Sequence, residues 1–408
     1  MRSLRAPDYR KRWSERFAYY PVGRVIKADL VFHAVSVGEV HAAVPLIEKV
    51  LANTPQLSLL VTTSTPTGSA RVSALFGERV EHVYLPYDYP GAVNRFLDAC
   101  NPSLLVIMET EWWPNLLHYC RARNIYTLLA NARLSEKSRN NYARMPGLAR
   151  TMLESFDSVT AQSDQDRSRL ESLGLPADKV DVVGSIKYDL ALNTAHISKA
   201  RSDRALLGNR PVVLAASTRT LDGVAEEDKV LAAFRQVLEK HSDVLLVLVP
   251  RHPERFDETF ALSEKHAFNT VRRSTGQLPE LDHQVYLGDS MGEMHYYLGL
   301  ADITFVGGSL VPTGCQNIIE PAALGLPVIT GPSLFNFSAV SEALIGHGGQ
   351  LTVNNEQELA AELIRLLESE SDREAMGKAA REVVTRNRGA TDRNLAVISG
   401  LLNLNATR

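Results

Sequence analysis

The chain alternates short apolar runs with segments of helical spacing, and it does so twice along its 408 residues. The runs in the first half are Leu30–Val35, Leu57–Thr63, Val80–Leu85, Leu104–Met108, Tyr126–Asn131, Ser158–Gln162 and Val180–Val183. Those in the second half are Val212–Ala216, Leu245–Val249, Val285–Leu287, Ile303–Val306, Val328–Thr330 and Gln350–Val353. Strands separated by helices pair in parallel and are covered on both faces. The sequence therefore predicts an α/β fold with two Rossmann-like, doubly wound domains facing a cleft.

The domain boundaries follow from the gaps in this pattern. Residues 190–210 are polar and contain no clear strand run, which is typical of a linker. We assign residues 1–189 to the N-terminal domain, 190–210 to the linker and 211–385 to the C-terminal domain. Residues 386–408 form a terminal helix that is able to pack back on the N-terminal domain. A chain of this length suits two domains.

Composition excludes several classes of protein. The net charge is -3, which gives no reason to expect nucleic-acid binding. Cys100, Cys120 and Cys315 form no C-x-x-C pair, so we expect reduced thiols in a cytoplasmic protein and no structural zinc. No run of 18 or more apolar residues is present, and the sequence predicts no membrane-spanning helix.

The start of the chain mixes basic and aromatic residues. They are Arg2, Arg5, Arg10, Lys11, Arg12, Trp13, Arg16, Phe17, Tyr19 and Tyr20. Such a mixture suits an anionic membrane surface, and a solvated basic helix is the alternative. A membrane anchor preceding this segment is a further expectation.

A glycine-rich segment from Val306 to Pro332 follows an apolar strand and opens a helix near Asn317. Glycines let the backbone approach a ligand, and a helix N-terminus attracts phosphate. No Walker lysine follows, so the segment predicts a nucleotide pocket other than a P-loop. Asn317 and Glu320 also fit a capping box, which only starts a helix. In the alternative, Glu320 accepts hydrogen bonds from a ribose diol.

Glu39 lies at the turn between the first strand and the next helix. Partial burial there raises a carboxyl pKa and suits a general base, whereas the helix N-terminus favours the ionised form. A good first-turn residue is the other interpretation of Glu39. His33, Glu39 and His41 do not have the H-E-x-x-H spacing, so we do not predict a metal site.

Charged residues follow other strands in both halves. Glu109 and Glu111 follow the fourth strand, where two buried acids are costly unless they bind something. Lys187 follows the seventh strand, where it balances the charge of a leaving phosphate or helps to hold the two domains; a solvated lysine is the alternative. Arg219 and Arg251 end strands of the second half, where they meet a phosphate or acidic sugar or remain solvated surface residues.

Several long motifs occur together and in order. They are His33–Glu39, Thr62–Gly68, Met108–Asn115, Asn131–Ser135, Pro250–Arg255 and Gly307–Phe337. Over nearly the whole chain they resemble the 3-deoxy-D-manno-octulosonic acid (Kdo) transferases of lipopolysaccharide assembly. The resemblance implies a GT-B fold, CMP-Kdo as donor and a lipid A precursor, a tetraacyldisaccharide bisphosphate, as acceptor. It implies an inverting transfer that needs no metal or other cofactor, on the cytoplasmic face of the inner membrane.

The resemblance also assigns residues. It implies that Glu39 is the general base and that Glu109 and Lys187 support the transition state. The donor-binding positions that it implies are Ser217, Arg251, His252, Met291, Gly292, Glu293, Gly308, Ser309, Asn317, Ile318, Ile319 and Glu320. The implied acceptor-binding positions, in the N-terminal domain, are Ser36, Gly38 and Glu111.

Three residues depart from the family pattern: Ser185, Arg219 and Gln316. They affect the expected details of the donor site and leave the reaction class unchanged. Two rival hypotheses stay open at this point. One is a GT-B enzyme that uses another nucleotide sugar, including an epimerase. The other is an inactive nucleotide-sugar-binding scaffold at a membrane.

Overall fold

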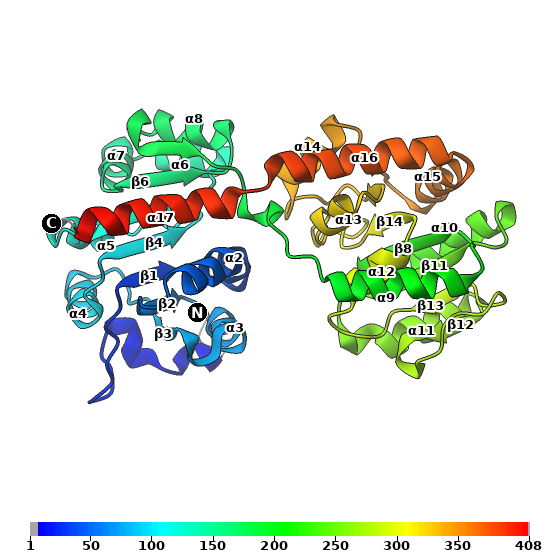
Figure 1. Cartoon of the computed structure of the whole chain (residues 1–408), viewed down its shortest axis with the longest axis horizontal. Coiled ribbons are helices and arrows are strands. Elements are labelled where there is room, and N and C mark those ends of the chain that lie inside the picture. Colours follow the sequence, from blue (N-terminus) through cyan, green and yellow to red (C-terminus); the bar gives the residue numbers. More distant parts are fainter. Residues whose placement is uncertain (1–6, 407–408) are drawn as a thin grey trace. The chain divides into compact units, whose positions relative to one another are not determined.

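The computed structural model describes residues 7–406, and the chain divides into two compact units (Figure 1). The first unit runs to Asp189 and includes the residues from Asn387 onward. The second unit spans Leu190–Arg386. Each unit contains a seven-stranded parallel sheet, which confirms the predicted α/β fold.

The first sheet has the strand order β3-β2-β1-β4-β5-β6-β7. Its strands are β1 Leu30–His33, β2 Leu59–Thr63, β3 Glu81–Tyr84, β4 Leu104–Met108, β5 Tyr126–Ala132, β6 Ser158–Ala161 and β7 Val180–Val182. Leu30 of β1 pairs in register with Leu59 of β2 and with Leu104 of β4. Successive strand residues alternate between two buried cores, so that both faces of the sheet are covered.

The helices of the first unit begin with recognisable signals. They are α2 Val37–Asn53, α3 Pro66–Phe76, α4 Pro90–Cys100, α5 Pro114–Ala122, α6 Glu136–Tyr142, α7 Pro146–Glu154, α8 Asp164–Ser172 and α17 Ala390–Ala406. Proline stands at the start of α3, α4, α5 and α7, where its missing N–H costs nothing. Side chains of Thr65, Ser135 and Ser163 accept N–H hydrogen bonds at the starts of α3, α6 and α8.

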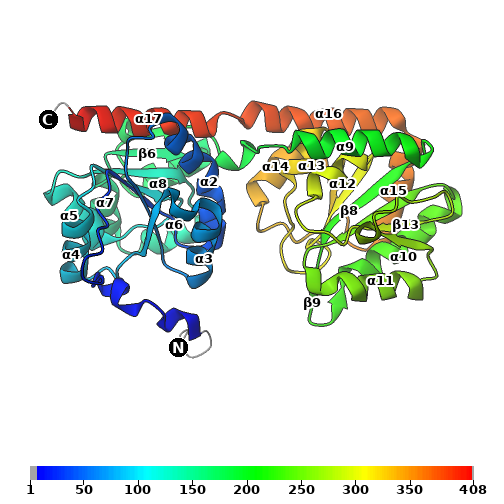
Figure 2. The same ribbon diagram turned by 60° about the horizontal axis from the view of Figure 1, so that its bottom comes forward.

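Helix α17 comes from the end of the chain and belongs to the first unit (Figure 2). Ile398 and Leu401 of this helix join the core on the face of the sheet that α2 covers. Lys49 of α2 forms an ion pair with Asp392 at the start of α17. Asn394 is buried and accepts a hydrogen bond from Thr160 of β6. The first sheet therefore owes part of its cover to residues more than 200 positions away in the sequence.

The second sheet has the order β12-β13-β11-β8-β14-β15-β16. Its strands are β8 Val212–Thr218, β11 Leu245–Pro250, β12 Thr270–Arg272, β13 Val285–Leu287, β14 Ile303–Val306, β15 Val328–Thr330 and β16 Gln350–Thr352. A separate antiparallel pair, β9 Thr220–Leu221 and β10 Val224–Ala225, follows β8. Strands β9, β10 and β12 are absent from the sequence prediction. Strands β9 and β10 have two residues each, and β12 has a single apolar residue, Val271, between two polar ones, so none of them forms a recognisable apolar run.

The helices of the second unit are α9 Thr194–Arg204, α10 Glu226–Lys240, α11 Phe256–Lys265, α12 Met294–Leu300, α13 Ile319–Leu324, α14 Ser338–Gly346, α15 Glu356–Glu368 and α16 Glu370–Asn387. Short 3-10 helices complete both units: η1 Pro7–Arg10, η2 Trp13–Phe17, η3 Gly77–Arg79, η4 Ala177–Lys179, η5 Ile186–Tyr188, η6 Ala205–Leu207, η7 Pro253–Arg255 and η8 Arg273–Thr275. Within residues 7–406, no helix combines the length and the apolar character that a bilayer crossing requires.

The segment interpreted as a linker, residues 190–210, largely consists of α9 and η6 and belongs to the second unit. Ala200 of α9 is fully buried, and a Cβ atom at Gly299 of α12 would lie only 2.6 Å from its Cβ. Asp203 accepts a hydrogen bond of 2.8 Å from the Tyr296 hydroxyl. Small residues and one buried polar contact hold α9 in place, which explains why its polar sequence resembles a linker.

The basic N-terminal segment makes internal contacts. Arg2 and Arg5 lie outside the described residues, but Arg16 is only 4% exposed and Glu15 only 3%. Glu15 forms ion pairs with Arg12 at 2.6 Å and with Arg24 at 3.0 Å. Part of the positive charge that suggested a surface helix is therefore neutralised inside the first unit.

Candidate active site

Glu39 lies in the first turn of α2, and burial determines its protonation. Its Oε2 atom accepts the Val35 N–H at 2.7 Å, and Oε1 lies 3.4 Å from the Ser36 hydroxyl. Burial, together with the smaller effect of the charges of Glu109 and Glu111, raises the pKa of Glu39 to about 7, against the opposing effect of the Val35 N–H. The competition between burial and helix N-terminus, left open by the sequence, is decided in favour of burial. A carboxyl group with this pKa suits a general base near neutral pH.

Glu109 follows β4 in a strained conformation. Its φ of 59° lies in the left-handed region, which costs energy for a residue with a side chain. The carboxylate is buried, and Oε2 accepts a hydrogen bond of 2.8 Å from Nε of Arg133. Arg133 follows β5 and was not predicted as a site residue. Its position directly after a strand, within the Asn131–Ser135 motif, was the available signal.

Lys187 lies on η5, directly after β7. Burial lowers its pKa, with Glu109 raising it and Arg133 lowering it. Asn131 holds η5 by accepting the Ile186 N–H at 3.1 Å. Asp189 accepts the N–H groups of Gly389 and Thr391, each at 2.6 Å, so the start of α17 also fixes this segment. Lys187, Glu109 and Arg133 are thus electrostatic neighbours.

The remaining predicted residues of the first unit surround these groups. Burial and the charge of Glu109 raise the pKa of Glu111. Ser36 is half-buried and Gly38 is exposed in the first turn of α2. Trp112 belongs to the core and stacks on Tyr142 at 4.2 Å between ring centroids. The first unit therefore brings Glu39, Glu109, Glu111 and Lys187 near one another, and their catalytic and acceptor-binding roles remain predictions.

His33 does not contribute a charge. It is fully buried at the end of β1, its Nδ1 atom lies 2.9 Å from the Thr62 hydroxyl, and burial lowers its pKa to about 4. The imidazole is therefore neutral at physiological pH. In the part of the chain that the structure describes, no three His, Cys, Asp or Glu side chains are grouped as a metal site.

The glycine-rich loop of the second unit is built around a buried acid, Glu226. Its carboxylate accepts the N–H groups of Gly308 at 2.6 Å, Ser309 at 3.0 Å and Leu310 at 2.8 Å. A fourth N–H, from Arg219, lies at 3.0 Å. Burial raises the pKa of Glu226, and these four N–H groups oppose that rise. The sequence singled out the loop but missed the acid that fills it, because the partners are 82 to 84 positions apart.

The pairing changes what the loop offers to a ligand. Gly307 has no room for a side chain, since its Cβ would lie 2.5 Å from the Thr218 Cα atom. The Ser309 hydroxyl donates to the Val306 carbonyl at 2.6 Å and accepts the Gly331 N–H at 2.8 Å. The N–H groups of Gly308 and Ser309 are occupied by Glu226. Donor binding by these two residues remains a prediction, and it would have to use other atoms.

The start of α13 differs from a capping box. Asn317 accepts the N–H of Ile319 at 3.0 Å, and the cap position, Ile318, makes no side-chain cap bond. Burial raises the pKa of Glu320, while its hydrogen bond to Asn317 and the charge of Arg251 lower it. Ile318 and Ile319 are buried in the interior. Glu320 is therefore a half-buried acid close to a cation, Arg251.

Arg251 lies close to Glu320 and contacts Gln316, one of the three residues that differ from the family pattern. Its side chain is exposed, and Nε donates to Oε1 of Gln316 at 3.2 Å. His252 follows it, and burial together with Arg219 lowers the pKa of its imidazole. Ser217, the last residue but one of β8, has a φ of 57°. Of the residues predicted for the donor site, Arg251 and Glu320 are therefore electrostatic neighbours, and Gln316 contacts Arg251.

The turn before α12 has its own internal support. The carboxylate of Glu293 forms hydrogen bonds with Arg273 at 2.8 and 3.1 Å, and Arg273 lowers its pKa. Gly292 has a φ of 82°, which a glycine adopts without strain. Met291 remains 57% exposed at the tip of this turn. Donor binding by these residues remains a prediction.

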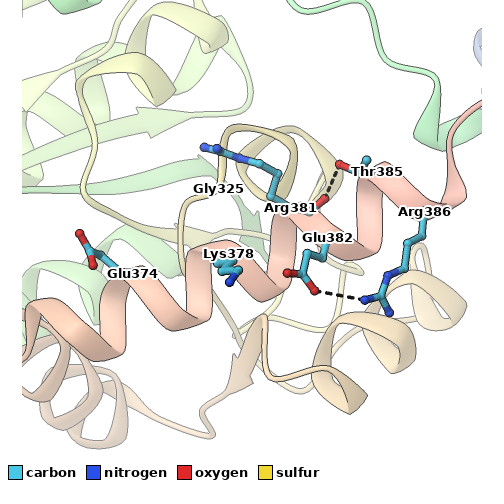
Figure 3. A pocket seen from close by; sticks show the side chains of 7 residues that line it. All are labelled: Gly325, Glu374, Lys378, Arg381, Glu382, Thr385 and Arg386. Carbon is cyan, nitrogen blue, oxygen red and sulfur yellow. Dashed lines mark hydrogen bonds and ion pairs between the residues drawn. The ribbon is translucent and has the colours of Figure 1, made fainter.

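A hollow of about 630 Å³ lies beside α16 (Figure 3). It is lined by Gly325, Glu374, Lys378, Arg381, Glu382, Thr385 and Arg386. Arg386 pairs with Glu382 at 3.2 Å, and Arg381 donates to the Leu324 carbonyl at 2.6 Å. Its lining carries charges of both signs, and none of the predicted site residues is among them.

Two units of this kind, each with a seven-stranded parallel sheet covered by helices, form the GT-B fold. Solved structures of low sequence identity share the fold: a UDP-GlcNAc 2-epimerase from Neisseria meningitidis (TM-score 0.59, 16% identity, 91% of this chain and 98% of that chain) and a glycosyltransferase from Rickettsia africae (TM-score 0.57, 15% identity, 92% and 99%). Residues 11–190 match the family described as 3-Deoxy-D-manno-octulosonic-acid transferase (kdotransferase), and residues 206–383 match glycosyl transferases group 1.

Curated relatives are similar over nearly the full length. The 3-deoxy-D-manno-octulosonic acid transferase of Haemophilus influenzae is 42% identical over 99% of this chain and 94% of its own. That of Bordetella pertussis is 37% identical over 92% and 88%. The chain belongs to the 3-deoxy-D-manno-octulosonic acid (Kdo) transferase family. It is a glycosyltransferase that transfers Kdo in lipopolysaccharide synthesis.

Proposed function

We propose that this enzyme transfers Kdo from CMP-Kdo to a lipid A precursor, a tetraacyldisaccharide bisphosphate, with inversion and without a metal. The observation that carries the proposal is Glu39, whose pKa is raised to about 7 beside Glu109 and Glu111. Glu39 takes the proton of the acceptor hydroxyl as its oxygen attacks C2 of Kdo, and CMP leaves. The positive charge that develops on the sugar is stabilised by nearby carboxylates, Glu109 foremost.

The donor binds to the second unit. Arg251 meets the phosphate of CMP, and Glu320 accepts hydrogen bonds from the ribose diol. The partial burial of Glu320, which raises its pKa, supports a role beyond starting α13. Lys187, whose pKa is lowered by burial, supports the transition state from the first unit.

In this proposal the first unit binds the acceptor and contacts the membrane. Ser36, Gly38 and Glu111 bind the disaccharide. The N-terminal segment still exposes Trp13 (55%) and Tyr19 (58%), and aromatic side chains favour the membrane interface. The enzyme works as a peripheral protein at the cytoplasmic face of the inner membrane, where its lipid acceptor is held.

A transfer assay in excess EDTA tests the reaction. The purified protein is mixed with metal-free CMP-Kdo and the lipid A precursor in excess EDTA. The mass of the product is measured by mass spectrometry. We expect a Kdo-bearing product at the rate seen without EDTA. Product that disappears with EDTA and returns with added Mg²⁺ would contradict the metal-free proposal. Absence of product, with UDP stabilising the protein better than CMP, would favour another nucleotide sugar.

Glu320→Ala tests the donor site. We expect CMP affinity to fall by about 10- to 100-fold, because the ribose loses hydrogen bonds to a charged group. Isothermal titration calorimetry with CMP measures this change. The control is Asn355→Ala, which removes a helix cap from the start of α15, where Asn355 accepts the Glu358 N–H at 2.9 Å. It should cost about 1 kcal/mol of stability without changing CMP affinity. Unchanged CMP affinity in Glu320→Ala would leave Glu320 only a structural role.

A further inference from the structure

The guanidinium of Arg16 is buried at one edge of the first sheet. Nη1 donates to the Ser64 carbonyl at 3.0 Å, and the group lies 4.2 Å from the centroid of the Tyr84 ring. Its Nε and Nη2 atoms have no hydrogen-bond partner among the described residues. Burying these donors is costly, and a nonpolar side chain of similar size would avoid that cost. This cost indicates that the guanidinium of Arg16 has a role that a nonpolar side chain cannot take.

Further hydrogen bonds lead from Ser64, which Arg16 contacts, to Glu39. The Ser64 N–H donates to the Val35 carbonyl at 3.1 Å, and Thr65 donates its hydroxyl to the same carbonyl at 3.3 Å. The Val35 N–H in turn donates to the carboxylate of Glu39 at 2.7 Å. A continuous series of contacts thus joins Arg16 to Ser64, Val35 and Glu39.

This series follows the order of the strands. The carbonyl of Arg16 accepts the N–H of Tyr87, in the loop after β3, at 2.8 Å. Its side chain contacts the loop after β2, and that loop contacts the loop after β1, which precedes Glu39. Strands β3, β2 and β1 are neighbours in the sheet, so each contact joins adjacent strand ends. The N-terminal segment is therefore attached to the row of loops that ends at the general base.

We propose that Arg16 is a positioning residue for transfer: it fixes the loop after β2, and through it the Val35 N–H that holds the Glu39 carboxylate. The inference rests on the proposed role of Glu39 as the base. In this arrangement the N-terminal segment, which carries Trp13 and Tyr19 on its surface, is structurally connected to the catalytic carboxylate. Arg16 acts through Ser64 and Val35 and does not contact substrate.

The test is the pH profile of kcat for Arg16→Met. The charges facing Glu39 are those of Glu109 and Glu111, with Lys187 and Arg133 beside Glu109. They remain in the variant, whereas a loosened Val35 N–H no longer favours the charged carboxylate. We expect kcat to fall about 10-fold and the acidic limb to move upward by roughly half a unit to one unit. Arg16→Lys, which keeps a donor for the Ser64 carbonyl, should restore most of the wild-type profile.

Two further variants separate positioning from simple support. Arg95→Met removes both hydrogen bonds from Arg95 to the Phe17 carbonyl, 3.2 and 2.7 Å long, and so loosens the same segment without touching Ser64. We expect it to lower Tm and to leave the acidic limb in place. Tyr84→Leu removes the ring beneath Arg16 and should move the acidic limb of the kcat profile in the direction expected for Arg16→Met. It therefore tests the inference even if Arg16→Met does not fold.

The outcomes are distinct. A limb that stays at its wild-type pH in both Arg16→Met and Tyr84→Leu overturns the inference, as does an equal shift in Arg95→Met. Retained transfer in Glu39→Gln would instead remove the base on which the inference depends. The pH profile of Arg16→Met tests the positioning role of Arg16, and the activity of Glu39→Gln tests the role of Glu39 as the base, so failure of one proposal is distinguishable from failure of the other.

Discussion

Glu39→Gln is expected to lose about 10²- to 10⁴-fold in transfer rate, the usual contribution of a general base. Glutamine keeps an oxygen that can accept the Val35 N–H, so the turn before α2 should keep its shape. CMP affinity should not change, because the proposed donor residues belong to the second unit. Steady-state kinetics with the lipid acceptor, together with CMP titration, measure both quantities.

The control for this variant lies on the same helix. Glu48→Gln makes the same chemical change at an exposed position of α2, where Glu48 pairs with Arg79 at 2.7 Å. Surface ion pairs contribute about 0–1 kcal/mol, so this variant should transfer Kdo at the wild-type rate. If Glu39→Gln were also near wild type, the proposed base would be wrong. If it unfolded, Glu39 would be chiefly a structural residue.

The wild-type enzyme should also carry the signature of this carboxyl group in its pH dependence. The base works only when ionised, so kcat/KM should fall about tenfold per pH unit below the Glu39 pKa of about 7. The contribution of Glu39 to the unfolding free energy changes with pH in the opposite direction. The folded state holds this proton more tightly than the unfolded state, so this group's contribution to the unfolding free energy decreases as pH rises from 4.5 to about 7. Glu39→Gln should remove both effects.

Glu226→Gln is expected to cost the second unit about 3–5 kcal/mol in unfolding free energy. The two carboxylate oxygens accept four backbone N–H groups from Arg219 and from residues 308–310. A glutamine amide has one oxygen, and its NH₂ group would face N–H donors. Buried donors without partners cost about 1–3 kcal/mol each. CMP binding should weaken as well, because the loop that precedes Asn317 and Glu320 loses its support.

The location of the tryptophans makes this test specific. All three, Trp13, Trp112 and Trp113, belong to the first unit, so their fluorescence follows the unfolding of that unit. In urea, Glu226→Gln should shift the transition seen by circular dichroism and leave the fluorescence midpoint in place. Glu239→Gln, an exposed position on the same helix α10, is the control and should change neither. An unchanged circular dichroism transition in Glu226→Gln would show that the loop amides find other partners.

The differences between prediction and structure at the site and in helix α9 have one physical origin. Arg133 binds Glu109 across 24 positions of sequence, and Glu226 binds the glycine-rich loop across 82 to 84. Neither pairing leaves a periodic pattern that a local window of sequence can detect. Helix α9 gave the same difficulty, since Ala200 and Asp203 are buried by contacts with α12 and not by an apolar stripe of their own.

The sequence by itself determined the two parallel sheets, the family and the location of Glu39, Glu109 and Lys187 at strand ends. Apolar period and strand-end chemistry are local properties, so they can be recognised before the chain is folded. Only the tertiary structure decided that burial outweighs the helix N-terminus at Glu39, and that a carboxylate of the protein fills the glycine-rich loop. Those outcomes depend on which distant groups exclude water from an ionisable side chain, and this is fixed only when the chain has packed.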